Sequence, residues 1–165
     1  MFVFGEEIYN NIPKYISNHD ELYIHIRGGD IFSGRQENYV QPPLCFYEHI
    51  LSKFSFKKVF IISEDKRNPI IDALLNKYTN IYYLENNFTQ AVSYIAHAQN
   101  LAISTSSFSL GIVRLSKNIK NVFIYNCFSN VSKFDWLIDG NKKYKKKYRS
   151  IIMEPTKEYI TEMFP

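Results

Sequence analysis

Short apolar runs of strand length alternate with longer amphipathic stretches along most of this chain, and this alternation constrains the fold more than any other feature. Strand character is found in residues 22–27, 58–62, 81–84, 101–103 and 121–125. Helical length and spacing are found in 44–54, 69–78, 88–100 and 108–117, and a further helix, interrupted by Pro13, fits within 6–17. Strands that alternate with helices are typical of βαβ units. The pattern predicts an α/β domain, doubly wound around a mostly parallel sheet.

The length and composition predict one globular domain. The chain has 165 residues and is 45% hydrophobic, which is enough to bury a core without disulfide or metal support. We expect a single domain over residues 1–165. Within it, residues from about 126 to 165 form an aromatic and basic C-terminal tail whose fold the sequence does not predict.

The basic charge of the chain is confined to one segment near its C-terminus. The net charge is +4, and six of the 20 basic residues lie within 142–149, so the remaining 14 basic and 16 acidic residues give −2. One interpretation of this segment is a solvated loop or helix face, and another is a nucleic-acid-binding segment with Tyr144 and Tyr148 as stacking partners. We favour the first interpretation and expect no nucleic acid partner, because the rest of the domain is not basic.

Nothing in the sequence indicates export or membrane insertion. The apolar residues 1–4 are followed at once by Gly5, Glu6 and Glu7, so there is no core of signal-peptide length and no apolar run long enough to span a membrane. Cys45 and Cys127 are far apart and form no CxxC pair, which fits a reducing compartment. We expect a soluble, cytoplasmic protein.

The end of the first expected strand carries a candidate diphosphate site. In a doubly wound sheet the ligand crevice lies at the carboxyl ends of the strands. Strand alternation places His25 and Arg27 on one face there, and Gly28 and Gly29 follow, which allows a ligand to approach the backbone. The guanidinium of Arg27 matches the paired oxygens of a phosphate. A structural ion pair between Arg27 and Asp30 explains the pattern equally well.

Four consecutive hydroxyl residues, Ser104 to Ser107, stand between a short buried strand and a helix. The first N–H groups of a helix and the positive end of its dipole favour a phosphate, and hydroxyl side chains add donors. Helix capping is the alternative, but it needs fewer hydroxyl residues than this turn contains. We favour ligand binding.

The strand at 58–62 is followed by Ser63, Glu64 and Asp65, whose carboxylates can accept hydrogen bonds from a guanine edge or from ribose hydroxyls. The alternative is a solvated turn that leads to a helix capped by Asn68, with Pro69 as its first residue. The sequence has no Asp-x-Asp, no GxGxxG, no P-loop lysine motif and no clustered His/Cys set. We therefore expect no metal and no other cofactor.

In this order the three motifs resemble the donor-binding half of α-1,2-fucosyltransferases and their α-1,6 and protein O-fucosyl relatives. The matching segments are 25–30, 60–65 and 98–109, where that superfamily has an HxRRxD-type strand end, an S/T-D/E-D strand end and an SSFS-type turn. The resemblance implies a Rossmann-like domain that is one half of a GT-B fold. It also implies a glycosyltransferase with metal-independent, inverting transfer of fucose from the nucleotide sugar GDP-fucose to a glycan acceptor hydroxyl.

The resemblance further implies roles for individual residues. Arg27 would contact the β-phosphate of GDP-fucose, and His25 would help to hold the nucleotide. Asp65, or Glu64 beside it, would read the guanine. Three residues of the hydroxyl-rich turn would line the diphosphate and base pocket: Ser106, Ser107 and Phe108.

Catalysis would also need a general base for the acceptor hydroxyl. The loop carboxylates near the first motif are Asp30 and Glu37, and we select Glu37 because Asp30 is expected to brace the turn.

The chain departs from the family pattern at Gly28, where most of these enzymes have a second arginine. About twenty residues precede the first motif, whereas these enzymes have an N-terminal half that helps to form the acceptor cleft. A homo-oligomer or a partner chain would then complete that cleft. The alternative function is a catalytically silent nucleotide-sugar-binding module, or a fragment of a larger transferase.

Overall fold

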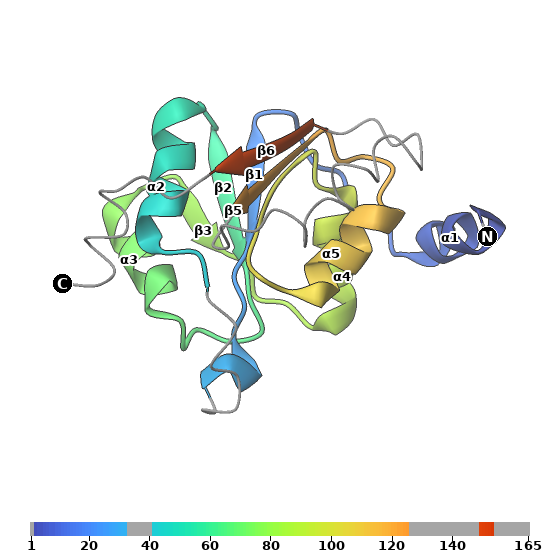
Figure 1. The fold of residues 1–165 in the computed structure, drawn as a ribbon, viewed down its shortest axis with the longest axis horizontal. Helices are drawn as coiled ribbons and strands as arrows, with labels where there is room; N and C mark the ends of the chain where they lie inside the picture. Colours follow the sequence, from blue (N-terminus) through green and yellow to red (C-terminus); the bar gives the residue numbers. More distant parts are fainter. Residues whose placement is uncertain (1, 33–40, 126–148, 154–165) are drawn as a thin grey trace.

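The computed structural model describes residues 2–32, 41–125 and 149–153, and its centre is a parallel sheet of six strands (Figure 1). The strands are β1 (Glu21–His25), β2 (Lys58–Ile62), β3 (Ile81–Tyr83), β4 (Asn100–Ile103), β5 (Asn121–Tyr125) and β6 (Arg149–Met153). Their order across the sheet is β3-β2-β1-β4-β5-β6, and every neighbouring pair is parallel.

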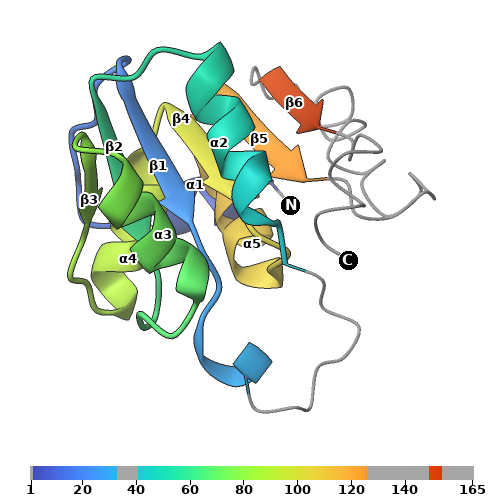
Figure 2. The same ribbon diagram turned by 90° about the vertical axis from the view of Figure 1, so that its left-hand side faces the viewer.

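Helices cover both faces of this sheet. The helices are α1 (Phe2–Asn11), α2 (Leu44–Lys53), α3 (Pro69–Lys77), α4 (Phe88–His97) and α5 (Ser107–Leu115), and a 3-10 helix, η1 (Gly29–Phe32), follows β1. Helices α2 and α3 lie on one face of the sheet, and α4 and α5 lie on the other (Figures 1 and 2). Their buried side chains pack against the strands on these two faces. The predicted doubly wound, Rossmann-like α/β class is confirmed.

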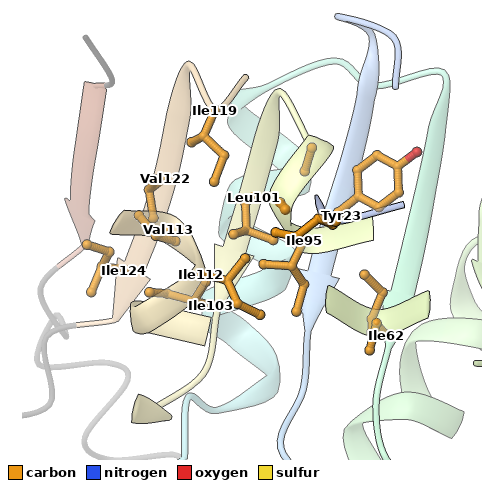
Figure 3. Close-up of a cluster of buried hydrophobic side chains, with 14 residues drawn as sticks. Tyr23, Ile62, Ile95, Leu101, Ile103, Ile112, Val113, Ile119, Val122 and Ile124 are labelled. Atoms are coloured by element: carbon orange, nitrogen blue, oxygen red, sulfur yellow. The ribbon is translucent and has the colours of Figure 1, made fainter. Parts of the chain in front are cut away.

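The core lies in two layers, because successive strand residues point to opposite faces. In β1, Leu22 and Ile24 face α2 and α3, whereas Tyr23 faces α4 and α5. Burial of each such side chain stabilises the fold by about 1.5–3 kcal/mol. Figure 3 shows the second layer, in which residues of α4 and α5 meet strand residues of the sheet: Ile95, Ile112 and Val113 against Leu101, Ile103, Val122 and Ile124.

The expected elements agree closely with the observed ones, and the largest differences lie at the two ends of the chain. Within the chain, the helix expected over 88–100 ends at His97, and Asn100 is the first residue of β4. The opening helix, α1, ends at Asn11 before Pro13, as expected, but it begins four residues before the expected range. The strand β6 lies inside the expected tail and pairs in parallel with β5. The rest of that tail, including the lysine-rich segment at 142–147, lies outside the described residues.

Among the described residues, no helix combines the length and the hydropathy needed to cross a bilayer.

Candidate functional site

The strand order places a topological switch point between β1 and β4. The sheet grows from β1 through β2 to β3 in one direction and from β4 to β5 in the other. In open α/β sheets the ligand crevice lies outside the carboxyl ends of the strands at such a point. The register pairs His25 with Ile62 on one side and with Ile103 on the other. The segments that follow β1, β2 and β4 therefore meet at one edge, here called the carboxyl edge.

Arg27 connects two of these segments. It is partly buried, and its Nη1 donates a hydrogen bond to the carbonyl oxygen of Thr105 over 3.4 Å. Its own carbonyl oxygen accepts a hydrogen bond from Asn68 Nδ2, also over 3.4 Å. The guanidinium of Arg27 thus lies beside the hydroxyl-rich turn, which is where a diphosphate could meet both.

Asp65 braces the glycine turn from the end of β2. Its Oδ2 accepts a hydrogen bond from the Gly29 N–H over 3.0 Å, and the Arg67 side chain donates to the same oxygen over 2.9 and 2.7 Å. The Arg67 backbone N–H donates to Oδ1. The hydrogen bonds from the Arg67 side chain, which outweigh the opposing effect of burial, lower the pKa of Asp65 below its ordinary value. Asp65 is therefore an ionised residue with a structural role, which holds the glycine turn against the segment after β2.

Both glycines of this turn are closely surrounded by side chains of the segment that follows β2. Gly29 has a φ of +63°, a conformation that costs other residues strain, and a Cβ there would overlap the Glu64 carboxylate. A Cβ at Gly28 would lie 2.9 Å from Asp65 Oδ1 and 3.2 Å from Ser63 Oγ. The space that the Cβ of a side chain at residue 28 would enter is thus occupied by side chains of the segment that follows β2, which accounts locally for the glycine.

The side chains of Glu64 and Ser63, next to Asp65 along the chain, form fewer hydrogen bonds with the described residues than Asp65 does. Glu64 is exposed, and within the described part of the chain its carboxylate forms no hydrogen bond or ion pair. Ser63 is 2% exposed, and its Oγ has no hydrogen-bond partner among the described residues. The end of β2 therefore presents one accessible carboxylate and one buried hydroxyl near the glycine turn.

The start of α5 differs from the starts of α3 and α4. Asn68 caps α3 by accepting a hydrogen bond from the Ile70 N–H, and Asn87 forms a capping box with Gln90 on α4. Ser106, the N-cap of α5, makes no side-chain cap hydrogen bond. The first N–H groups of α5 are thus not capped by this hydroxyl, and the exposed Ser107 stands beside them. This helix start can accept an anion.

His25 lies beneath the turn and is 7% exposed. Its Nδ1 is 3.4 Å from Ser104 Oγ, and its ring centroid is 5.6 Å from that of Phe108. Burial, and then the positive charge of Arg27, lowers the pKa of His25 to about 4. The imidazole is therefore neutral near pH 7 and supports the turn.

The structure brings most of the sequence-predicted site residues to one edge. His25, Arg27 and Gly28 at the end of β1 adjoin the turn that contains Ser106, Ser107 and Phe108, and Glu64 and Asp65 lie on the β2 side of the glycines. Glu37, the predicted general base, lies outside the described residues. Within the described ranges, no three His, Cys, Asp or Glu side chains are grouped closely enough to hold a metal ion.

Sequence reasoning missed Phe88. Its ring is 73% exposed, and its centroid lies 5.5 Å from that of Phe108, which in turn contacts His25. An aromatic residue at the start of an amphipathic helix is usually a core residue, so the sequence alone gave no signal that it would be exposed at this edge.

No model of a known protein family matches this sequence, and no curated protein matches it. Among solved structures, the chain is similar to that described as the crystal structure of NodZ alpha-1,6-fucosyltransferase soaked with GDP-fucose, with 11% identity and a TM-score of 0.44 over 76% of this chain. The match covers 44% of that chain, so this chain spans less than half of its length. A likeness this distant does not identify a ligand, which has to be inferred from the side chains at the carboxyl edge.

Proposed function

We propose that this chain is a fucosyltransferase-like glycosyltransferase that binds a nucleoside-diphosphate sugar, GDP-fucose, at the carboxyl edge without a metal ion. The observation that carries the proposal is that the Arg27 guanidinium lies beside the start of α5 at the switch point. Arg27 Nη1 reaches the carbonyl oxygen of Thr105, one residue before the N-cap of α5. A diphosphate is the ligand that such an arrangement favours.

The choice of fucose and guanine within this class rests on the order of the three sequence motifs. The hydrogen bonds of the two carboxylates favour Glu64 over Asp65 as the group that accepts from the guanine edge. Both oxygens of Asp65 already accept hydrogen bonds from Arg67 or Gly29, whereas the exposed Glu64 carboxylate can accept from a base edge. For His25 the burial supports a positioning role, in which the neutral ring holds Ser104 and Phe108.

In the proposed reaction the acceptor hydroxyl oxygen attacks the anomeric carbon of the sugar. The bond between that carbon and the β-phosphate oxygen breaks, and its electron pair leaves with GDP. Arg27 and the positive end of the α5 dipole stabilise the charge that develops on the phosphate. The acceptor proton passes to a general base, for which we propose Glu37.

A second candidate function is nucleotide-sugar binding without transfer, and the packing around Gly28 favours it. A Cβ at residue 28 would lie close to Asp65 and Ser63, and with glycine there the turn at residues 27–29 supplies one arginine to the proposed donor site. A single cation stabilises a leaving diphosphate less than two do. Incubation with GDP-fucose and a panel of glycans separates the two functions, because only a transferase releases GDP in proportion to added acceptor.

The donor proposal is tested by a thermal-shift series with GDP, UDP, ADP and their sugars, each with and without EDTA. A ligand that binds only the folded state raises stability in proportion to its affinity. We expect GDP and GDP-fucose to stabilise the protein most and EDTA to change nothing. Equal shifts for all nucleotides would contradict the guanine preference, and loss of binding in EDTA would contradict the metal-free site.

A further inference from the structure

An exposed aromatic ring stands beside the candidate diphosphate site. Phe88 is the first residue of α4, and Phe108 is the second residue of α5. Their ring centroids are 5.5 Å apart at an interplanar angle of 45°, and Phe108 is 5.6 Å from the buried His25 ring. Three rings therefore run from the buried end of β1 to the surface of the carboxyl edge.

The position of Phe88 is fixed although its side chain is exposed. The capping box of Asn87 and Gln90 sets the start of α4, and Ala91 and Ile95 anchor the helix in the core. The ring is nevertheless 73% exposed, so it contributes little buried area to the fold. An exposed aromatic ring on an anchored helix start is suited to stacking against a flat ligand group.

We propose that Phe88 and Phe108 form an aromatic platform on which the base of the bound nucleotide stacks, with Phe88 as the outer ring. Phe108 directly follows Ser107, which stands at the start of α5 where the diphosphate is proposed to bind. The platform and the phosphate site are thus contiguous along the chain, as the two ends of a nucleoside diphosphate require. The inference rests on the proposed function and names the surface that holds its base.

Stacking and phosphate binding can be separated experimentally with GDP and inorganic pyrophosphate, which has no base. Base–aromatic stacking contributes enough that removal of the ring weakens binding by about five-fold to about a hundred-fold. We expect Phe88→Ala to weaken GDP by at least about five-fold in calorimetry and to leave pyrophosphate unchanged. Phe88→Tyr, which keeps the ring, should bind GDP as the wild type does.

Tyr82→Ala is the matched control, because Tyr82 is an exposed aromatic on β3 that contacts Phe60 rather than the carboxyl-edge rings. This variant should bind both ligands normally. Folding of each variant is checked by thermal denaturation, and Phe88→Ala should melt close to the wild type because its ring is exposed.

The platform is overturned if Phe88→Ala binds GDP normally, or if it weakens GDP and pyrophosphate by the same factor. It is also overturned, while the diphosphate site stands, if the wild-type protein binds GDP no more tightly than pyrophosphate. If the wild type binds neither ligand, the proposed function fails and the platform fails with it.

Discussion

At the amino edge of the sheet, where the strands begin, buried polar side chains are hydrogen-bonded to distant parts of the chain. Asn100 Nδ2 donates to the carbonyl oxygens of His19 and Glu21, each over 2.9 Å, and Asn100 Oδ1 accepts from Asn121 Nδ2 over 2.7 Å. Ser17 Oγ donates to the His97 carbonyl oxygen over 2.6 Å. These bonds tie the starts of β1, β4 and β5 together.

At the carboxyl edge, three serine hydroxyls have a long hydrogen bond or none among the described residues. Ser63 Oγ has no partner among the described residues, Ser104 Oγ lies 3.4 Å from His25 Nδ1, and Ser106 does not cap α5 through its side chain. Satisfaction at the amino edge is not complete either, because Gln99 Oε1 is buried without a partner in the described chain. The difference indicates that polar groups at the amino edge hold the fold, whereas these three serine hydroxyls of the carboxyl edge contribute little to it.

Asn100→Ala should produce the largest loss of stability. The variant leaves the carbonyl oxygens of His19 and Glu21 and the amide of Asn121 without this partner. Since a buried polar group left unsatisfied costs roughly 1–3 kcal/mol, we expect the free energy of unfolding to fall by about 3–4 kcal/mol. Urea denaturation measures it, and a loss below about 1 kcal/mol would show that the amino edge does not hold the fold.

Acid should destabilise the protein through His25. The pKa of His25 is about 4 in the folded protein because of burial and of Arg27, whereas an unfolded histidine has a pKa of about 6.5. Between these values the unfolded state binds more protons, so stability falls as the pH falls from about 6.5 to about 4, by up to about 3 kcal/mol.

The titration of His25 is measured by NMR of labelled imidazole carbons, with His25→Gln to assign the signal. The unfolding free energy of the same two proteins is followed across this pH range. A folded-state pKa near 6.5 would mean that the ring is solvated and does not support the turn from below.

Arg27→Ala should weaken GDP binding by about ten-fold or more, because it removes a charge-assisted contact of roughly 1.5–3 kcal/mol. Folding should survive. Lys66→Ala is the control, since Lys66 is an exposed cation near the same edge that pairs with Glu85 at 3.3 Å. Normal GDP binding by Arg27→Ala in calorimetry, or its failure to fold, would favour a structural role for Arg27.

Local features of this fold were predictable from the sequence, and non-local ones were not. Asn68 and Pro69 predicted the start of α3, and the structure confirms both the cap and the helix. Which residues of α3 face the sheet was not predictable in the same way: Ile71 and Leu74 are fully buried, and this depends on the angle at which the helix packs on the sheet. The strand β6 was missed because its pairing with β5 is non-local and leaves no signature in its own five residues.

In the candidate site, too, the local features were predictable from the sequence and the side-chain contacts were not. Strand alternation and the strand-end rule predicted which segments would meet at the carboxyl edge. They could not predict that Asp65 is bound by Arg67 and Gly29 while Glu64 is not, because that depends on side-chain contacts across the turn. They also could not predict the exposure of Phe88, which depends on the placement of α4.

The smallest effect is expected from a pair of serine variants. Ser63→Ala removes a buried hydroxyl that has no hydrogen-bond partner in the described part of the chain, so the free energy of unfolding should change by less than about 0.5 kcal/mol. Ser17→Ala removes the 2.6 Å bond to His97 and should cost about 1 kcal/mol. Thermal and urea denaturation of both variants compares the edges directly. Equal losses would mean that Ser63 has a structural partner after all.

The central claim is that a nucleoside diphosphate binds at the carboxyl edge between β1 and β4, and a titration of the labelled protein with GDP followed by amide NMR tests it most directly. We predict that the amide signals of Gly28, Gly29 and the first residues of α5 shift, because these groups adjoin the proposed phosphate. The amide signals of Glu21, Asn100 and Asn121 at the amino edge should stay in place. Shifts confined to the amino edge, or no shifts at any GDP concentration, would contradict the account.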